Sequence, residues 1–243
     1  MCRMIAIIPS CNNTRQLVQV LANFKKKFVD EICIVIDRAT QPEINQVERA
    51  ASKTPVPVCI IRRQKRRGVG SAIREGIKYA IQNNYDVAVI MAGNGKDQPN
   101  EIARLLAPIL KEKYDYVQGS RFLNGGKRVK NPLLRGMFSR LYPIVWSLLT
   151  KSRCTDVTNG FRAYKLSLFQ DQQIDISQSW LDGYELEYYI HYKALTLGYK
   201  TKEVPVSKIY PFRHKGGYSN ISPLHDWWQI VGPLIYLKAG VRK

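Results

Sequence analysis

The sequence holds 243 residues, of which 45% are hydrophobic and 23% are charged, and these fractions exclude an intrinsically disordered chain. Lysine and arginine number 38 against 19 aspartate and glutamate residues, so the formal net charge at pH 7 is +19. This excess predicts an anionic partner such as a phosphate group, a nucleic acid or an acidic membrane surface, unless the charge only solvates the surface.

The five cysteines have no CxxC spacing, and two of them lie within apolar runs. We therefore expect a reducing compartment and no zinc site. The apolar segment at residues 4–9 is too short for a signal peptide, which predicts a cytoplasmic location. The apolar stretch at residues 133–149 is interrupted by Arg135, Arg140 and Pro143, and no stretch reaches the roughly 20 residues of a spanning helix. We expect a protein that lies on a membrane without crossing it.

Apolar runs of strand length alternate with helical patterns in the first half of the chain. Strands are expected at residues 4–9, 32–37, 56–62, 86–91 and 115–119, with helical spacing of apolar residues between them. This alternation predicts an α/β fold with a mostly parallel sheet, in which ligands bind at the carboxyl ends of the strands. The rule selects residues 9–12, 37–40, 62–70, 92–97 and 119–122.

The second half changes character. A basic glycine-containing loop at residues 125–130 precedes the apolar helix at 133–149, and a helix at 184–197, a strand at 202–210 and an apolar tail follow. With no repeat and no linker, we expect a single domain over residues 1–243.

The segment from Arg66 to Ile77 places two glycines between a predicted strand and a predicted helix. Gly68 and Gly70 lack a Cβ atom, so the backbone there can approach a phosphate or a sugar closely. The same spacing also occurs in ordinary tight turns.

Together with its neighbours, this segment resembles glycosyltransferase family 2. The matches are Pro9 with Asn12 after the first strand, Asp37 at the end of the second, and the run from Arg67 to Ala72. The resemblance implies a GT-A (Rossmann-like) nucleotide-sugar-binding fold with helices on both faces of the sheet and a C-terminal amphipathic segment. It also implies that Asp37 contacts the nucleotide base or ribose, whereas an aspartate at a strand end is often a turn former. The nucleotide-sugar-binding residues that it implies are Pro9, Asn12, Asp37, Arg67, Gly68, Gly70 and Asn94.

Later motifs resemble the polyprenyl-phosphate branch of this family, typified by dolichyl-phosphate mannose synthase. They are residues 119–122 (GSRF), 156–163 (DVTNGFRA) and 203–206 (EVPV). The resemblance implies inverting transfer of a hexose from a UDP- or GDP-sugar to a polyprenyl phosphate. The residues expected to hold the acceptor phosphate are Arg121, Arg135, Ser139, Arg162 and Arg213, since guanidinium groups bind phosphate oxygens bidentately. Alternatively, Arg135 solvates the surface or a membrane interface, and Arg162 forms a structural salt bridge.

One departure from the family concerns the metal. Most relatives carry an Asp-x-Asp motif that holds Mg²⁺ or Mn²⁺ on the diphosphate, and this chain has Ala92 and Asn94 at those two positions. Because such cations prefer carboxylate oxygens, Asp97 is the remaining local ligand, with Asn94 as a neutral oxygen. Either Mg²⁺ or Mn²⁺ binds weakly through Asp97, or Lys96 replaces the metal charge on the leaving diphosphate. A third interpretation is a catalytically silent protein that binds sugar nucleotide or lipid.

The candidate catalytic residues are Lys96, Asp97, Arg121 and Asp182. An acceptor phosphate is already ionised at neutral pH and needs no general base. A saccharide hydroxyl, as in the synthesis of cell-surface polysaccharide, needs one, and Asp182, Glu185 and Glu187 are then the candidates. Glu185 and Glu187 also fit solvated charges on a helix.

The resemblance divides the domain into a nucleotide-sugar half (1–120), an acceptor half (121–222) and a membrane-interface tail (223–243). The tail combines tryptophans, an apolar block and cations, as interfacial segments do, although it also fits an ordinary core element. Relatives often continue into transmembrane helices, so the resemblance implies either a separate membrane-protein partner or peripheral attachment, unless the acceptor is soluble. No nucleic-acid-binding module is recognisable, so we expect no nucleic-acid partner. We expect a peripheral location on the cytoplasmic face of a membrane.

Overall fold

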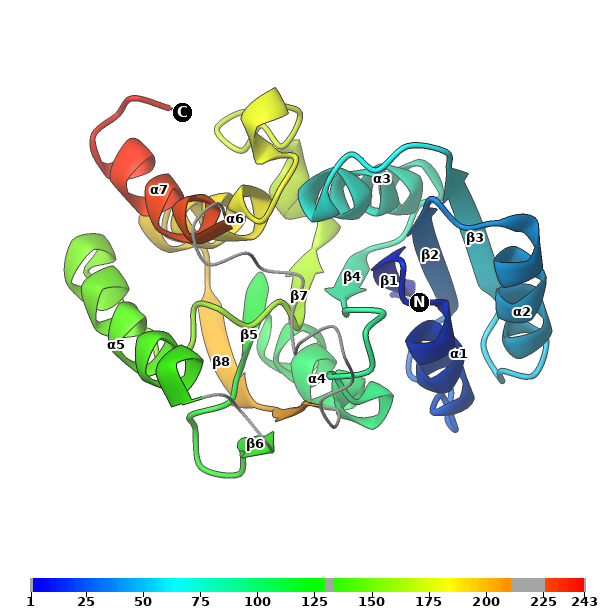
Figure 1. Cartoon of the computed structure of the whole chain (residues 1–243). Helices are drawn as coiled ribbons and strands as arrows, with labels where there is room; N and C mark the ends of the chain where they lie inside the picture. Colours follow the sequence, from blue (N-terminus) through cyan, green and yellow to red (C-terminus); the bar gives the residue numbers. More distant parts are fainter. Residues whose placement is uncertain (1, 130–132, 211–225, 243) are drawn as a thin grey trace.

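The computed structural model describes residues 2–129, 133–210 and 226–242, which form a seven-stranded central sheet (Figure 1). The strand order is β3-β2-β1-β4-β7-β5-β8. The strands are β1 (Met4–Cys11), β2 (Glu31–Asp37), β3 (Val58–Arg63), β4 (Val87–Ile90), β5 (Tyr116–Ser120), β7 (Arg162–Lys165) and β8 (Thr201–Pro205). All neighbours pair in parallel except β7, which runs antiparallel to β4 and β5. The predicted α/β class with a mostly parallel sheet is confirmed.

The strand expected at residues 202–210 is divided in two. β8 ends at Pro205, and the chain then continues as β9 (Ser207–Ile209), which pairs in parallel with β6 (Lys127–Val129) in a separate two-stranded sheet. Prediction of one continuous strand was therefore wrong, and the short antiparallel strand β7 was not predicted.

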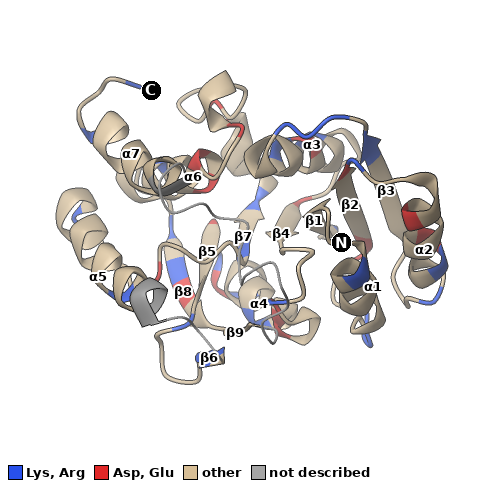
Figure 2. Cartoon of the chain, viewed as in Figure 1, with Lys and Arg blue, Asp and Glu red and all other residues tan. Residues whose placement is uncertain are grey.

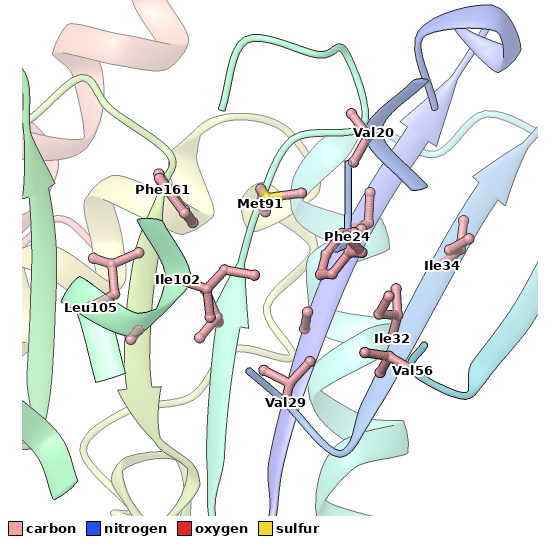
Figure 3. Packing of buried hydrophobic residues seen from close by; sticks show 14 of the residues in the cluster. Val20, Phe24, Val29, Ile32, Ile34, Val56, Met91, Ile102, Leu105 and Phe161 are labelled. Carbon is pink, nitrogen blue, oxygen red and sulfur yellow. The ribbon is translucent and has the colours of Figure 1, made fainter. Parts of the chain in front are cut away.

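Helices cover both faces of the sheet. They are α1 (Thr14–Ala22), α2 (Gln41–Ala51), α3 (Val69–Gln82), α4 (Ile102–Glu112), α5 (Leu133–Thr150), α6 (Glu185–Thr196) and α7 (Asp226–Lys238). Because side chains alternate along a strand, Ala6 and Ile8 pack with residues of α1, α2 and α4, whereas Ile5 and Ile7 pack with α3 and α6. Figure 3 shows part of the first cluster.

The order of the strands creates a switch point between β1 and β4. From β1 the chain moves outward to β2 and β3 and then crosses back to β4 on the other side of β1. In open α/β sheets the loops on either side of such a switch point leave in different directions, and ligands bind in the crevice between them. The loop after β4 contacts the end of β1, because the Gly93 amide donates a hydrogen bond to the main-chain oxygen of Pro9 at 3.3 Å.

A third cluster of buried residues joins α5, α6 and α7 at one end of the sheet. Tyr142 and Trp146 of α5 pack with Tyr188 of α6 and with Ile230 and Leu234 of α7. The inner face of α7 is therefore part of the core. This agrees with the interpretation of the C-terminal tail as an ordinary core element.

The outer face of α5 is apolar and exposed. Its exposed side chains recur at helical spacing and are Met137, Leu141, Ile144, Val145 and Leu148. The exposed cations Arg140, Lys151 and Arg153 flank it. Within the described ranges, no helix has the length and hydropathy that crossing a membrane requires.

We expect Leu105→Ala to lower the free energy of unfolding by about 2–5 kcal/mol, because Leu105 is fully buried beneath the sheet and its truncation leaves a cavity. Urea unfolding followed by circular dichroism measures this. Leu148→Ala is the matched control, since Leu148 is 74% exposed and its truncation should change stability by no more than about 0.5 kcal/mol. Equal losses in the two variants would contradict the assigned core.

Candidate active site

The turn after β1 borders the crevice at the switch point. Asn12 is exposed and has a φ of 55°, a left-handed conformation that asparagine tolerates better than most residues. The side chain of Asn13 closes the turn, since its Oδ1 accepts hydrogen bonds from Ser10 Oγ at 2.6 Å and from the Cys11 amide at 2.9 Å. Pro9 and Asn12 thus lie where the resemblance placed them, at the carboxyl end of β1.

Asp37 ends β2 and is buried in an ion pair with Arg63, which ends β3. The Arg63 Nε and Nη2 atoms lie 2.5 and 2.8 Å from the two carboxylate oxygens. Arg63 Nη1 also donates to Ser71 Oγ at 3.0 Å, at the start of α3. A nucleotide contact by Asp37 would therefore involve a carboxylate that is already ion-paired, and the role of Arg63 was missed because the sequence shows it only as one cation in a basic run.

Gly68 and Gly70, in the segment from Arg67 to Gly70 (the RGVG segment), have a packing role. A Cβ atom at Gly68, whose φ is +97°, would lie 2.2 Å from the carbonyl oxygen of Asp182. One at Gly70 would lie 2.2 Å from the carbonyl oxygen of Leu181. The space next to both glycines is thus filled by the backbone before α6. The absence of a Cβ at these two positions is thus required by packing within the protein, and a nucleotide-sugar contact of the backbone there stays a prediction.

Exposed cations form the loop between β3 and α3, which Figure 2 shows as a continuous blue segment. Lys65, Arg66 and Arg67 are all exposed there. Arg67 therefore remains accessible to an anion at the edge of the crevice, in contrast to the two glycines that follow it.

Asp97 lies in the loop after β4 and is almost completely buried, and both of its carboxylate oxygens are engaged. Oδ1 accepts a hydrogen bond from Lys208 Nζ at 2.7 Å, and Oδ2 accepts one from the Ala92 amide at 3.1 Å. Asn94 Oδ1 accepts from the Lys96 amide at 3.2 Å. Across the part of the chain that the structure describes, no three His, Cys, Asp or Glu side chains form a group suited to a metal ion. The geometry therefore does not fit Asp97 as a ligand of Mg²⁺ or Mn²⁺, because an ammonium group occupies the carboxylate.

Lys208 was not predicted as a site residue. Its Nζ atom also donates to Asn159 Oδ1 at 3.1 Å, which links the loop after β4 to the DVTNGFRA motif. Lys96 is buried beside it, with Nζ 5.2 Å from the centre of the Tyr210 ring. Since 111 positions separate Asp97 from Lys208, no local pattern in the sequence could have paired them.

Arg121 follows β5 and is buried against Asp156. Its Nε and Nη2 atoms each lie 2.7 Å from a carboxylate oxygen of Asp156, and Nη2 also donates to Thr158 Oγ1 at 2.6 Å. Burial alone lowers the pKa of Arg121, but the charge of Asp156 raises it above its ordinary value. The Nη1 atom lies 3.3 Å from the Tyr210 hydroxyl. The Arg121 guanidinium, which we expected to bind a phosphate, therefore has Asp156 as its carboxylate partner. Its Nε and Nη2 atoms bond to that carboxylate, and its Nη1 atom points toward Tyr210.

Arg162 is a structural residue. Its guanidinium is fully buried and donates to the main-chain carbonyl oxygens of Val157, Asn159 and Glu187. These three acceptors fix the DVTNGFRA motif against α6. Because the side chain is buried, an acceptor phosphate cannot reach it, and that expectation is corrected. The alternative of a structural salt bridge is replaced by bonding to carbonyl oxygens.

The other residues expected at the acceptor phosphate lie on or after α5. Ser139 is buried on α5. The side chain of Arg135 and the whole of Arg213 lie outside the described residues.

The acidic residues before and on α6 differ in their surroundings. Asp182 is ion-paired with Arg74. Burial raises the pKa of Glu185, whose Oε2 atom is buried without a hydrogen-bond partner among the described residues. Glu187 faces the DVTNGFRA motif, since a Cβ atom at Gly160 would lie 2.6 Å from its Oε1. Solvated helix charges therefore do not describe Glu185 and Glu187.

Residues 5–172 match the family described as Glycosyl transferase family 2. An undecaprenyl-phosphate mannosyltransferase of Micrococcus luteus is 28% identical over 208 residues, which cover 84% of this chain and 83% of the relative. A UDP-N-acetylglucosamine–dolichyl-phosphate N-acetylglucosaminyltransferase of Methanococcus voltae is 26% identical over 221 residues, 84% of each chain.

A solved structure of glucosyl-3-phosphoglycerate synthase from Mycobacterium tuberculosis, in complex with Mn²⁺, UDP-glucose and phosphoglyceric acid, has a TM-score of 0.70. It is 14% identical, and the alignment covers 100% of this chain and 81% of that one. The likeness confirms the expected GT-A fold.

We expect Gly70→Ala to lower the melting temperature in the absence of any ligand, corresponding to about 1–3 kcal/mol, because the new methyl group meets the backbone of residues 181–183. Differential scanning calorimetry measures this. Arg67→Ala is the control, since it removes an exposed side chain from the same loop and should leave stability unchanged. If Gly70→Ala weakened nucleotide binding and kept the wild-type melting temperature, the packing role would be wrong.

Proposed function

The chain belongs to glycosyl transferase family 2 and is a glycosyltransferase, and on this basis we propose that it transfers a hexose from a UDP- or GDP-sugar to a polyprenyl phosphate. The observation that carries the proposal is the group of buried cations at the carboxyl edge of the sheet, formed by Lys96, Lys208 and Arg121 around Tyr210. Buried cations suit a reaction in which both the leaving group and the acceptor are phosphates. Relatives named as polyprenyl-phosphate mannosyltransferases support the acceptor class.

The proposed reaction is a single displacement. An oxygen of the acceptor phosphate attacks the anomeric carbon, the bond from that carbon to the diphosphate breaks, and the electron pair leaves with the nucleoside diphosphate. Because attack and departure occur on opposite faces, the configuration is inverted. The acceptor phosphate is already ionised at neutral pH, so no proton has to be removed. The chain then supplies orientation and fixed positive charge.

A saccharide hydroxyl is the second candidate acceptor, and the surroundings of Glu187 favour it. Its carboxylate lies against Gly160 in the DVTNGFRA motif, within reach of the same edge of the sheet. A hydroxyl acceptor would lose its proton to such a carboxylate during attack. Glu187→Gln would then abolish transfer, whereas transfer to a phosphate should not need its basicity.

We further propose that the protein binds peripherally to the cytoplasmic face of a membrane through the outer face of α5. This face exposes apolar side chains next to the cations Arg140, Lys151 and Arg153. Apolar burial and attraction to anionic lipids together favour interfacial binding. Such binding would bring the lipid acceptor to the site without a spanning helix.

In a transfer assay, radiolabelled UDP- or GDP-hexose and detergent-dispersed polyprenyl phosphate should give labelled lipid that extracts into organic solvent. Lys96→Met should lower the rate by about 100-fold, because it removes one fixed donor near the transferred charge. Lys202→Met is the matched control, since the Lys202 ammonium pairs with Glu112 at the surface. Label that appears only in saccharide, or only as free sugar, would refute the lipid acceptor.

In a flotation assay with vesicles of phosphatidylcholine and phosphatidylglycerol, the variant Leu141→Ser with Leu148→Ser should bind about tenfold less, because two exposed leucines lose their apolar contact with lipid. Leu110→Ser is the control, since this exposed leucine lies on α4. Equal binding by both variants would exclude α5 as the contact.

A further inference from the structure

We propose that the ammonium group of Lys208 takes the place of the divalent cation on the donor diphosphate, so that this chain binds its nucleotide and transfers the sugar without a metal. The inference rests on the proposed function and deepens it. It assigns Lys208 as a catalytic residue that touches the diphosphate, and Asp97 as the positioning residue that holds Lys208.

The donor set at this position does not suit a metal. Ala92 has no ligand atom, and Asn94 offers a neutral oxygen that accepts from the Lys96 amide. The carboxylate of Asp97 lies 2.7 Å from the Lys208 ammonium. A magnesium ion would have to reach about 2.1 Å from that carboxylate and would repel the ammonium group beside it.

The fold fixes the backbone on both sides of Lys208. The Ser207 amide and hydroxyl donate to the buried carboxylate of Glu101 at 2.8 and 3.0 Å. The Ile209 amide donates to the main-chain oxygen of Lys96 at 3.0 Å. β9 therefore runs along the loop that in most relatives carries the metal, and Lys208 is held in place before any ligand arrives. A charge that needs no reorganisation is the most effective kind for stabilising a leaving group.

The hydrogen bonds of Lys208 leave room for an anion. An ammonium group has three N–H donors, and two of them go to Asp97 and Asn159. Among the residues that the structure describes, none accepts the third. The side chain as a whole is 11% exposed, so it is not completely enclosed by the described residues. A phosphate oxygen of the donor is a suitable third acceptor.

The charge balance also supports the replacement. In an Asp-x-Asp site, two carboxylates and one divalent cation sum to zero. Here Asp97 contributes one negative charge, and Lys208 and Lys96 contribute two positive charges, so the local sum is +1. The exchange therefore keeps at least as much positive charge for the diphosphate. It also explains why Asp97 is present, because a buried ammonium group without a carboxylate is unstable.

The first test measures the affinity of UDP and of GDP for the wild-type protein by isothermal titration calorimetry, in EDTA and in Mg²⁺ or Mn²⁺. We expect one of the two nucleotides to bind equally well, within about twofold, in EDTA and in either metal. Binding that EDTA abolishes and a metal restores would overturn the inference and leave the proposed function intact. If neither nucleotide bound under any condition, the proposed function itself would fail.

The second test removes the ammonium group. Lys208→Met should weaken nucleotide binding at least about tenfold, with and without metal, whereas Lys208→Arg should retain part of the affinity. Because Lys208→Met leaves a buried carboxylate alone, the double variant Asp97→Asn with Lys208→Met is measured as well and should show the same loss. Lys202→Met, which changes a half-buried lysine on β8 that pairs with Glu112, should bind like wild type. Wild-type affinity in either Lys208→Met protein would refute the role of Lys208.

Discussion

Buried carboxylates paired with buried cations hold the carboxyl edge of the sheet together. Asp37 pairs with Arg63, Asp97 with Lys208, and Asp156 with Arg121, and each of these acidic side chains is at most 4% exposed. Removal of one partner from such a pair leaves an uncompensated charge and typically costs about 3–5 kcal/mol. Each pair also joins segments that are distant in sequence, so the carboxyl edge of the sheet is defined only when the complete set of loops has assembled. The positions of the other side chains at this edge depend on the pairing of these buried charges.

The main strands and helices could be predicted because their apolar patterns are local. β1, β2 and β4 are nearly continuous runs of buried aliphatic residues, and such runs need no information from elsewhere in the chain. β7 was missed because its four residues, from Arg162 to Lys165, contain two charged side chains and lack a strand-like pattern. It enters the sheet through its neighbours β4 and β5, which is a tertiary effect.

Several motifs lie at the carboxyl ends of strands, as the sequence predicted. A motif does not show what a side chain touches, however. Arg162 and the two glycines of the RGVG segment belong to motifs, and their contacts are internal to the protein. Lys208 belongs to no motif, although it joins Asp97 in the loop after β4 to Asn159 of the DVTNGFRA motif. Likewise, the apolar patterns of α5 and α7 do not show which side of each helix is buried. Packing shows that α7 buries Ile230 and Leu234 and exposes Trp228 and Ile235, and that α5 buries Tyr142 and Trp146 and exposes its outer face.

The placement of β7 limits how this chain can be divided. β5 lies within the first 120 residues, yet its partners in the sheet are β7 and β8, which come from the last 82 positions. A fragment that ended at residue 120 would contain β5 without either neighbour. The two portions that the sequence suggested, residues 1–120 and 121–222, therefore share one sheet and cannot be exchanged between proteins as modules. Substitutions that alter this scaffold without unfolding it have to fall within loops and on helix surfaces, with the sheet kept whole.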